Sequence, residues 1–269
     1  MCLLVLMFRD HPEFEVLLGG NRDEQYHRLA DPPAVLSKNP EIWGGRDRQA
    51  GGTWLGRNEY GVLAAITNFH DPQWPIPPQA LSRGSLLLEL LAHRSPLGAA
   101  SWITEQPLHR YRPFNLLFGN REQFYSFASH GAEPPRALLP GCYALSNSAL
   151  DDREWGKVAA AQGFLSHAKR AAGESLLLRL QAFLCDPPPS PGSPPAERSP
   201  RDSVFVNTPG YGTVSGSLLV SGGPLGERYY YADGVEMRKA QLDWAPRILT
   251  GADTVLPGSP FHRIPDFPH

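Results

Sequence analysis

Cys2 is the first residue of the sequence whose type and position predict a chemical role. Removal of Met1 would make this cysteine N-terminal. A free α-amine has a pKa of about 7.7–8.0 and a thiol about 8.5, so one residue then supplies both a base and a nucleophile. The alternative is a small, buried cysteine that opens a core strand, because cysteine is often buried and inert. A retained Met1 would exclude the chemistry.

A polar tetrapeptide, Asn-Arg-Asp-Glu at 21–24, follows the apolar segment 14–20. In isolation such a tetrapeptide would indicate a solvated turn. A short polar turn, however, joins 14–20 to the apolar segment 2–8, a pattern that predicts a β-hairpin. The end of the second strand then lies beside Cys2. An arginine at this point would favour the thiolate, and an aspartate would hold the α-ammonium group or orient a water molecule.

The rest of the chain predicts short strands separated by two pairs of helices. Strands are expected at 53–56, 61–67, 115–118, 123–128, 142–146, 204–206, 214–220 and 228–232, and helices at 82–93, 98–104, 154–171 and 174–184. Residues 30–52 are rich in proline and glycine and predict an irregular loop. Strands and helices alternate too rarely for a doubly wound sheet, so we expect an α+β fold of antiparallel sheets flanked by helices. The unbroken apolar character of 2–8 and 14–20 predicts strands that are covered on both faces.

The composition excludes several classes of protein. Lysine and arginine total 25 against 27 acidic residues, a net charge of −2 that provides no electrostatic footprint for nucleic acid. No window approaches the roughly 18–20 apolar residues of a membrane span, and the N-terminus lacks the pattern of a signal peptide. A cytoplasmic protein is therefore expected. Three cysteines without a C-x-x-C pair favour neither a disulfide framework nor a cysteine-based zinc site.

Three further patterns complete the expected organisation. The nine histidines form no metal-binding motif, so we expect neither a metal nor a cofactor. The glycine-rich segment 222–226 lacks the Lys-Ser/Thr of a phosphate-binding loop and predicts a hairpin turn. Seven prolines within 187–200 predict an exposed insertion in a single domain that spans residues 1–269.

The combination of Met1-Cys2, an apolar strand and Asn-Arg-Asp-Glu about twenty residues later resembles the Asn-Arg-Asp-Glu (NRDE) family, which includes transport and Golgi organisation 2-like proteins. Further matches lie at 51–56, 64–68, 82–84, 114–117, 145–148, 155–157, 211–213 and 227–228. The resemblance implies a four-layer αββα fold of the N-terminal-nucleophile (Ntn) hydrolase type. More distantly, the pattern is similar to choloylglycine hydrolases and penicillin V acylases.

The resemblance also implies roles for individual residues. The catalytic set would be Cys2, Arg22 and Asp23, with Asn68 and Asn147 as donors to an oxyanion or an amine. The residues expected to shape the site are Asn21, Glu24, Trp54, Arg83 and Asn115. The chain departs from the family at Val214, where an arginine usually follows Tyr-Gly-Thr.

Two functions follow from these residues. The first is hydrolysis of a linear amide of a small molecule through a Cys2 thioester, which the intact set of Cys2, Arg22 and Asp23 favours. The second is a non-catalytic carrier on the same fold, and the resemblance implies an apolar ligand such as haem, a lipid or an acyl-CoA as its partner. Val214 favours the carrier, because the missing arginine would correspond to a late catalytic arginine of the acylases.

Overall fold

The fold is described from a computed structural model. The structure describes residues 2–69, 74–75, 77–131, 133–185, 199–200, 202–240, 259–265 and 267, with the side chain of residue 2 outside this description. Nearly all of the predicted insertion at 187–200 also lies outside it.

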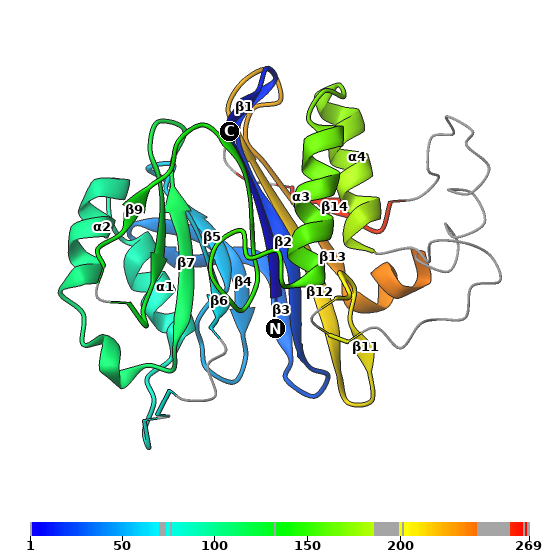
Figure 1. Cartoon of the computed structure of the whole chain (residues 1–269). Helices are drawn as coiled ribbons and strands as arrows, with labels where there is room; N and C mark the ends of the chain where they lie inside the picture. Colours follow the sequence, from blue (N-terminus) through cyan, green and yellow to red (C-terminus); the bar gives the residue numbers. More distant parts are fainter. Residues whose placement is uncertain are drawn as a thin grey trace.

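The first sheet contains the N-terminal hairpin at its centre. Its strands run in the order β10–β1–β2–β12–β13–β14, with β11 paired to β12, and every pairing is antiparallel (Figure 1). The bounds are β1 Cys2–His11, β2 Phe14–Gln25, β10 Gly141–Leu145, β11 Asn207–Thr208, β12 Tyr211–Ser221, β13 Arg228–Asp233 and β14 His262–Arg263.

The second sheet is an antiparallel meander in which neighbouring strands follow one another along the chain, from β3 to β9. The bounds are β3 Ala30–Lys38, β4 Glu41–Asp47, β5 Leu55–Asn58, β6 Leu63–Asn68, β7 Phe114–Gly119, β8 Phe124–Ala128 and β9 Arg136–Ala137.

Helices cover the outer face of each sheet, which completes the αββα order of layers (Figure 1). On the second sheet these are α1 Arg83–Leu91 and α2 Pro96–Thr104, followed by the short 3₁₀ helix η1 Leu108–Arg110; on the first they are α3 Gly156–Ala168, α4 Gly173–Leu184 and a helical segment at 234–240. Ser82 caps α1 as its sequence predicts, because its hydroxyl accepts a hydrogen bond from the Ser85 N–H. The predicted α+β fold is confirmed.

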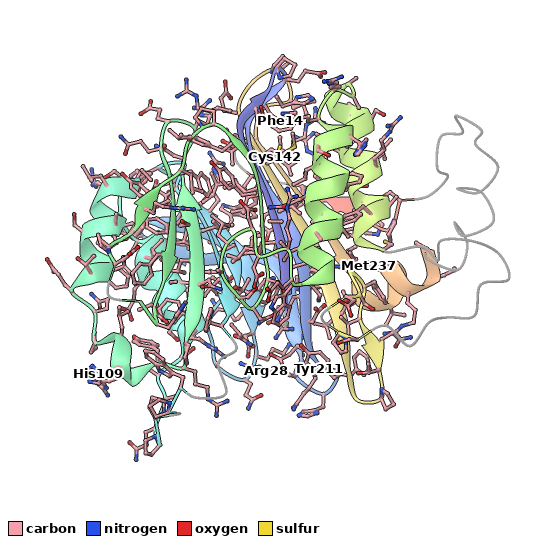
Figure 2. All side chains as sticks on the ribbon, in the orientation of Figure 1. Phe14, Arg28, His109, Cys142, Tyr211 and Met237 are labelled. Carbon is pink, nitrogen blue, oxygen red and sulfur yellow. The ribbon has the colours of Figure 1, made fainter. Side chains whose placement is uncertain are left out.

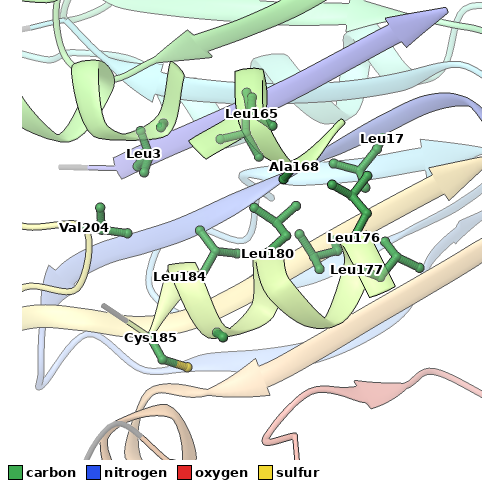
Figure 3. Packing of buried hydrophobic residues seen from close by; sticks show 14 of the residues in the cluster. Leu3, Leu17, Leu165, Ala168, Leu176, Leu177, Leu180, Leu184, Cys185 and Val204 are labelled. Carbon is green, nitrogen blue, oxygen red and sulfur yellow. The ribbon is translucent and has the colours of Figure 1, made fainter. Parts of the chain in front are cut away.

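The N-terminal hairpin is buried on both faces, as its continuous apolar sequence predicts. Along β1, residues 3, 5 and 7 pack against α3 and α4, while residues 4, 6 and 8 pack between the two sheets. Figure 3 shows Leu3 and Leu17 of the hairpin against Leu165 and Leu180 of these helices. The strands are longer than predicted, and β2 extends through the whole polar tetrapeptide.

The prediction of an irregular loop at 30–52 was wrong, because β3 and β4 lie within it. Pro32-Pro33 is tolerated because β3 is the edge strand of its sheet and is bulged at this point. The glycine pair of β4 does not form a turn. Without side chains at these two positions, the neighbouring strand and the Trp54 ring pack close to the β4 backbone. A Cβ atom at Gly44 would lie 2.8 Å from the Leu55 carbonyl oxygen, and one at Gly45 would lie 2.3 Å from the Trp54 ring.

The remaining predicted elements are confirmed with small shifts of their ends, apart from one strand. Residues 204–206 are buried but are not a strand, and the pairing begins only at β11. The segment 222–226 forms the predicted turn between β12 and β13, with positive φ at Gly222, Gly223 and Gly226. Within the described residues, no helix has the length and apolar character needed to cross a membrane.

Candidate active site

The paired ends of β1 and β2 bring the two predicted parts of the site together. In the hairpin register, the backbone of Cys2 lies opposite Arg22, and Leu3 lies opposite Asn21. The start of β1 therefore lies beside the end of β2, in the lower half of Figure 1. The backbone of Cys2 therefore lies beside the tetrapeptide, as predicted. The Cys2 side chain lies outside the described structure.

Arg22 extends from the first sheet to the second. Its Nη2 atom donates to Asp47 Oδ2 of β4 at 3.1 Å, and its guanidinium group stacks 4.7 Å from the centre of the Trp54 ring. Asp47 Oδ2 also accepts from Arg28 Nε at 2.8 Å, and Arg28 in turn pairs with Glu24 at 3.4 Å. The Arg22 side chain is only 6% exposed, so these contacts fix its position.

Asp47 is held as a carboxylate. Burial would raise its pKa, but hydrogen bonds from the backbone N–H groups of Ala50 and Gln49 and the charges of Arg28 and Arg22 outweigh burial and lower the pKa below its ordinary value. Sequence reasoning missed Asp47 because it lies in the segment that was expected to be a loop.

The neighbours of Arg22 face the opposite way, towards the helical layer. Asn21 Nδ2 donates to the backbone carbonyls of Leu184 at 2.8 Å and Val204 at 2.9 Å. The Asp23 carboxylate accepts from Lys157 Nζ of α3 at 3.2 Å and from Thr213 Oγ1 of β12 at 2.7 Å. The Lys157 and Asp23 side chains are both fully buried. The tetrapeptide is thus divided between the two faces of β2, which its sequence alone does not reveal.

The two predicted amide donors lie next to each other on separate segments. Asn147 is buried, and its Nδ2 atom donates to the backbone carbonyl of Asn68 at 2.8 Å. Asn68 ends β6 and is exposed. Asn115 Nδ2 donates to the Ser148 carbonyl at 2.9 Å, so it anchors the same loop that carries Asn147. Thr67 adds a 2.7 Å hydrogen bond to the Ser146 carbonyl.

A cavity of about 570 Å³, here called the arginine cavity, opens where β2 ends. Residues that line it include Arg22, Arg28, Arg83 and Arg112, the acidic residues Asp23, Glu24 and Asp47, and Trp54 and Asn68, although the Asp23 carboxylate itself is fully buried against Lys157. Figure 2 labels Arg28 at this lower edge of the molecule. Of the predicted site residues, Arg22, Asp23, Glu24, Trp54, Asn68 and Arg83 therefore share one cavity.

A second cavity of about 540 Å³, here called the Asn115 cavity, lies beside Asn115. Its lining mixes apolar side chains with polar and charged ones, and it includes Leu116, Phe127, Leu145 and Leu150 together with Asn115, His130, Glu133 and Arg136. Asn115 pairs with Thr67 in the β6–β7 ladder, one residue before Asn68 of the arginine cavity. Neighbouring residues of the same two strands thus contribute to both cavities.

Val214 lies in a β-bulge of β12. The register with β2 shifts between Thr213, which pairs with Asp23, and Ser215, which pairs with Arg22, so Val214 has no opposite residue on β2. Its side chain is partly buried. The position at which the resemblance implies an arginine is thus beside the two predicted catalytic residues of β2.

The other two cysteines are poor nucleophiles. Burial, together with a 3.2 Å hydrogen bond to Asp10, raises the pKa of Cys142 to about 12. Burial raises the pKa of Cys185, at the end of α4, to about 12 as well. Within the described part of the chain, no group of three or more histidine, cysteine or acidic side chains is arranged to hold a metal ion.

The αββα layers and the N-terminal hairpin define the fold of the Ntn hydrolases. The structure is similar to that of the Caenorhabditis elegans N-acylethanolamine-hydrolyzing acid amidase ortholog, with a TM-score of 0.51 and 9% identity over 81% of this chain and 92% of that chain.

The chain belongs to the Transport and Golgi organisation 2 family, whose model matches residues 1–223. It is 29% identical over 248 residues to the Transport and Golgi organization protein 2 homologs of Bos taurus and Homo sapiens, which covers 82% of this chain and 88% of each relative. The expected family and fold are therefore confirmed.

Proposed function

We propose that the protein hydrolyses a linear carbon–nitrogen amide bond of a small molecule through a thioester on Cys2. The observation that carries this proposal is the register that pairs Cys2 with Arg22. Directly opposite residues share one face of a sheet, and Arg22 uses the face that borders the arginine cavity. The fold shared with an N-acylethanolamine-hydrolyzing amidase supports an amide as the substrate.

The reaction needs two covalent steps. With Met1 removed, the α-amine accepts the Cys2 thiol proton, and the thiolate attacks the amide carbonyl carbon. The C–N bond then breaks, and the leaving amine takes the proton from the α-ammonium group. Water hydrolyses the thioester, which releases the carboxylic acid and restores the thiol.

The proposed supporting roles follow from the charges and donors around this point. Arg22 favours the thiolate by its positive charge, while Asp47 and Trp54 hold its guanidinium group in place. Asp23 orients the α-amine from the buried side of β2. The amides of Asn68 and Asn147 donate to the oxyanion, which develops only in the tetrahedral intermediate.

The test starts from the intact mass of natively expressed, untagged protein, which should lack Met1. On a panel of acyl amides, Cys2→Ala should lower kcat/KM by about 10³-fold or more, because the variant has no nucleophile. Cys142→Ala is the matched control and should retain turnover, because the high pKa of Cys142 keeps its thiol protonated. Retained Met1, or full turnover by Cys2→Ala, would refute the mechanism.

Val214 supports a second candidate, a carrier of haem, a lipid or an acyl-CoA. A valine lies at the bulge where the resemblance implies an arginine, and a cavity of about 540 Å³ with a partly apolar lining lies beside Asn115. Titration of wild type and Cys2→Ala with haem and with an acyl-CoA separates the two functions. Equal, tight binding to both proteins with no turnover of any amide would favour the carrier over the hydrolase.

A further inference from the structure

The Asp23 carboxylate is held by side chains of two other elements. Lys157 Nζ of α3, a helix on the outer face of the N-terminal hairpin (Figure 1), donates to Asp23 Oδ2 at 3.2 Å. Thr213 Oγ1 of β12 donates to Asp23 Oδ1 at 2.7 Å and accepts from the Val206 N–H at 2.9 Å. Both carboxylate oxygens thus have a donor, and the side chains of Asp23 and Lys157 are both 0% exposed. Burial and these contacts give the carboxylate one orientation.

The hairpin register places Asp23 beside the first atom of the Cys2 backbone. Leu3 lies opposite Asn21 and Cys2 opposite Arg22, so the ladder position opposite Asp23 precedes Cys2. The backbone nitrogen is the atom of Cys2 on that side. After removal of Met1 this nitrogen is the α-amine. Asp23 is therefore in register with the proposed base, whereas Arg22 is in register with the residue that carries the thiol.

A carboxylate without a counter-charge at this point would oppose the proposed mechanism. An α-amine has an ordinary pKa of about 7.7–8.0, and a neighbouring carboxylate favours its protonated form. A protonated amine cannot accept the proton of the Cys2 thiol. The Lys157 ammonium group carries the opposite charge, so the pair that it forms with Asp23 has no net charge. The pair can orient the amine without favouring the ammonium form.

The other charged and titratable groups around the buried ion pair are engaged elsewhere or exposed. Arg22 and Glu24 lie on the opposite face of β2, where each forms an ion pair of its own. Tyr211 of β12 donates its hydroxyl to the backbone carbonyl of Asp23 at 3.2 Å and not to its carboxylate. Asp202 lies beside the start of α3 and is exposed. Among the described residues, the ammonium group of α3 is therefore the only charge paired with the Asp23 carboxylate.

We propose that Lys157 is a positioning residue for catalysis, which acts through Asp23 to keep the Cys2 α-amine neutral and able to accept a proton. The inference rests on the proposed hydrolase function, in which the α-amine is the base. It gives α3 a part in the reaction, although Lys157 does not line the arginine cavity. A lysine that only joins α3 to β2 would stabilise the fold and leave the titration of the α-amine unchanged.

Titration of the α-amine tests the proposal. A Cys2→Ala background keeps the α-amine and removes the thiol, and trace labelling with acetic anhydride at a series of pH values, read by peptide mass spectrometry, gives the midpoint. Lys157→Met should raise this midpoint by about one pH unit or more, because Asp23 then acts on the amine without its counter-charge. Lys169→Met is the matched control, since this lysine pairs with Asp10, and it should not move the midpoint. An unchanged midpoint in folded Lys157→Met would overturn the inference.

A charge-balanced double variant decides the question if Lys157→Met alone does not fold. Asp23→Asn combined with Lys157→Met removes both buried charges together and leaves neither one unpaired. If Lys157 offsets Asp23, the midpoint of the double variant should lie within about half a pH unit of that of the parent protein. If Asp23 acts on the amine without such an offset, loss of the carboxylate should lower the midpoint by about one unit or more, and this result would overturn the inference.

The labelling does not depend on turnover, so the inference and the hydrolase function can fail separately. If wild type hydrolyses an amide, the acid limb of its kcat/KM profile should move to higher pH in Lys157→Met with the intact Cys2 thiol. If wild type hydrolyses none of the panel, the hydrolase function fails, while shifted labelling midpoints would still establish that Lys157 acts on the α-amine. Turnover by wild type together with unchanged midpoints in Lys157→Met would overturn the inference and leave the hydrolase function intact.

Discussion

The two faces of β2 use the same tetrapeptide for different purposes. Arg22 faces the space between the sheets, where it borders a cavity and meets Asp47 of the opposite sheet. Asn21 and Asp23 face the helical layer, where Lys157 and two backbone carbonyls hold them. One face can reach a ligand, whereas the other ties β2 to α3 and α4. Adjacent polar residues therefore have different roles: Arg22 borders the cavity, whereas Asn21 and Asp23 hold β2 against the helices.

Among the substitutions that test the difference between the two faces of β2, removal of the buried Lys157 should have the largest effect. Lys157→Met removes the buried ammonium group that pairs with the Asp23 carboxylate, and we expect the free energy of unfolding to fall by about 3–5 kcal/mol. Urea unfolding followed by circular dichroism measures the loss. Lys169→Met, which breaks a partly exposed ion pair with Asp10, is the control and should change the midpoint little. An unfolding free energy of Lys157→Met equal to that of wild type would show that this face of β2 is not an anchor.

Neighbouring substitutions should separate stability from reactivity. Asn21→Ala removes the donor to two buried carbonyls, and we expect the free energy of unfolding to fall by about 1–3 kcal/mol. Its effect on turnover should be smaller than that of Arg22→Gln. Arg22→Gln should lower turnover of an amide substrate by about tenfold or more, because the Cys2 thiol then loses the charge that favours its thiolate. Urea unfolding and kcat/KM are measured on both variants. A larger loss of turnover in Asn21→Ala together with a larger loss of stability in Arg22→Gln would contradict the division between the two faces.

The smallest expected effect is a dependence of the free energy of unfolding on pH, which arises from Asp47. Its pKa in the folded protein lies below the ordinary value of 3.8, so the unfolded chain binds the proton more readily in the interval between the two. The stabilisation is fully present above pH 3.8 and is lost as the pH falls through the folded pKa. The stability difference between wild type and Asp47→Asn should therefore shrink on acidification below pH 3.8. A difference that stays constant down to the lowest pH at which both fold would contradict this assignment.

The sequence predicted the hairpin and its neighbourhood because continuous apolar segments leave few alternatives for β1 and β2. It did not divide the tetrapeptide between two faces, because the second strand was expected to end at residue 20, before the alternation of side chains along a strand could be applied to 21–24. Asp47 and Lys157 lie 25 and 134 residues from their partners Arg22 and Asp23, so only the folded chain reveals these pairs. The strands at 30–47 were missed because proline and glycine usually indicate loops. Here the prolines lie on the edge strand β3, and the glycines of β4 allow neighbouring residues to pack close to its backbone.

The proline pair of β3 also limits how the protein can associate with other chains. Proline has no N–H group, so a further strand that approached the free edge of β3 at Pro32-Pro33 would find a ladder donor missing. The opposite edge of this sheet, β9, is only two residues long and contains Arg136. A foreign strand therefore finds no long template at either edge, which protects the second sheet against edge-to-edge aggregation.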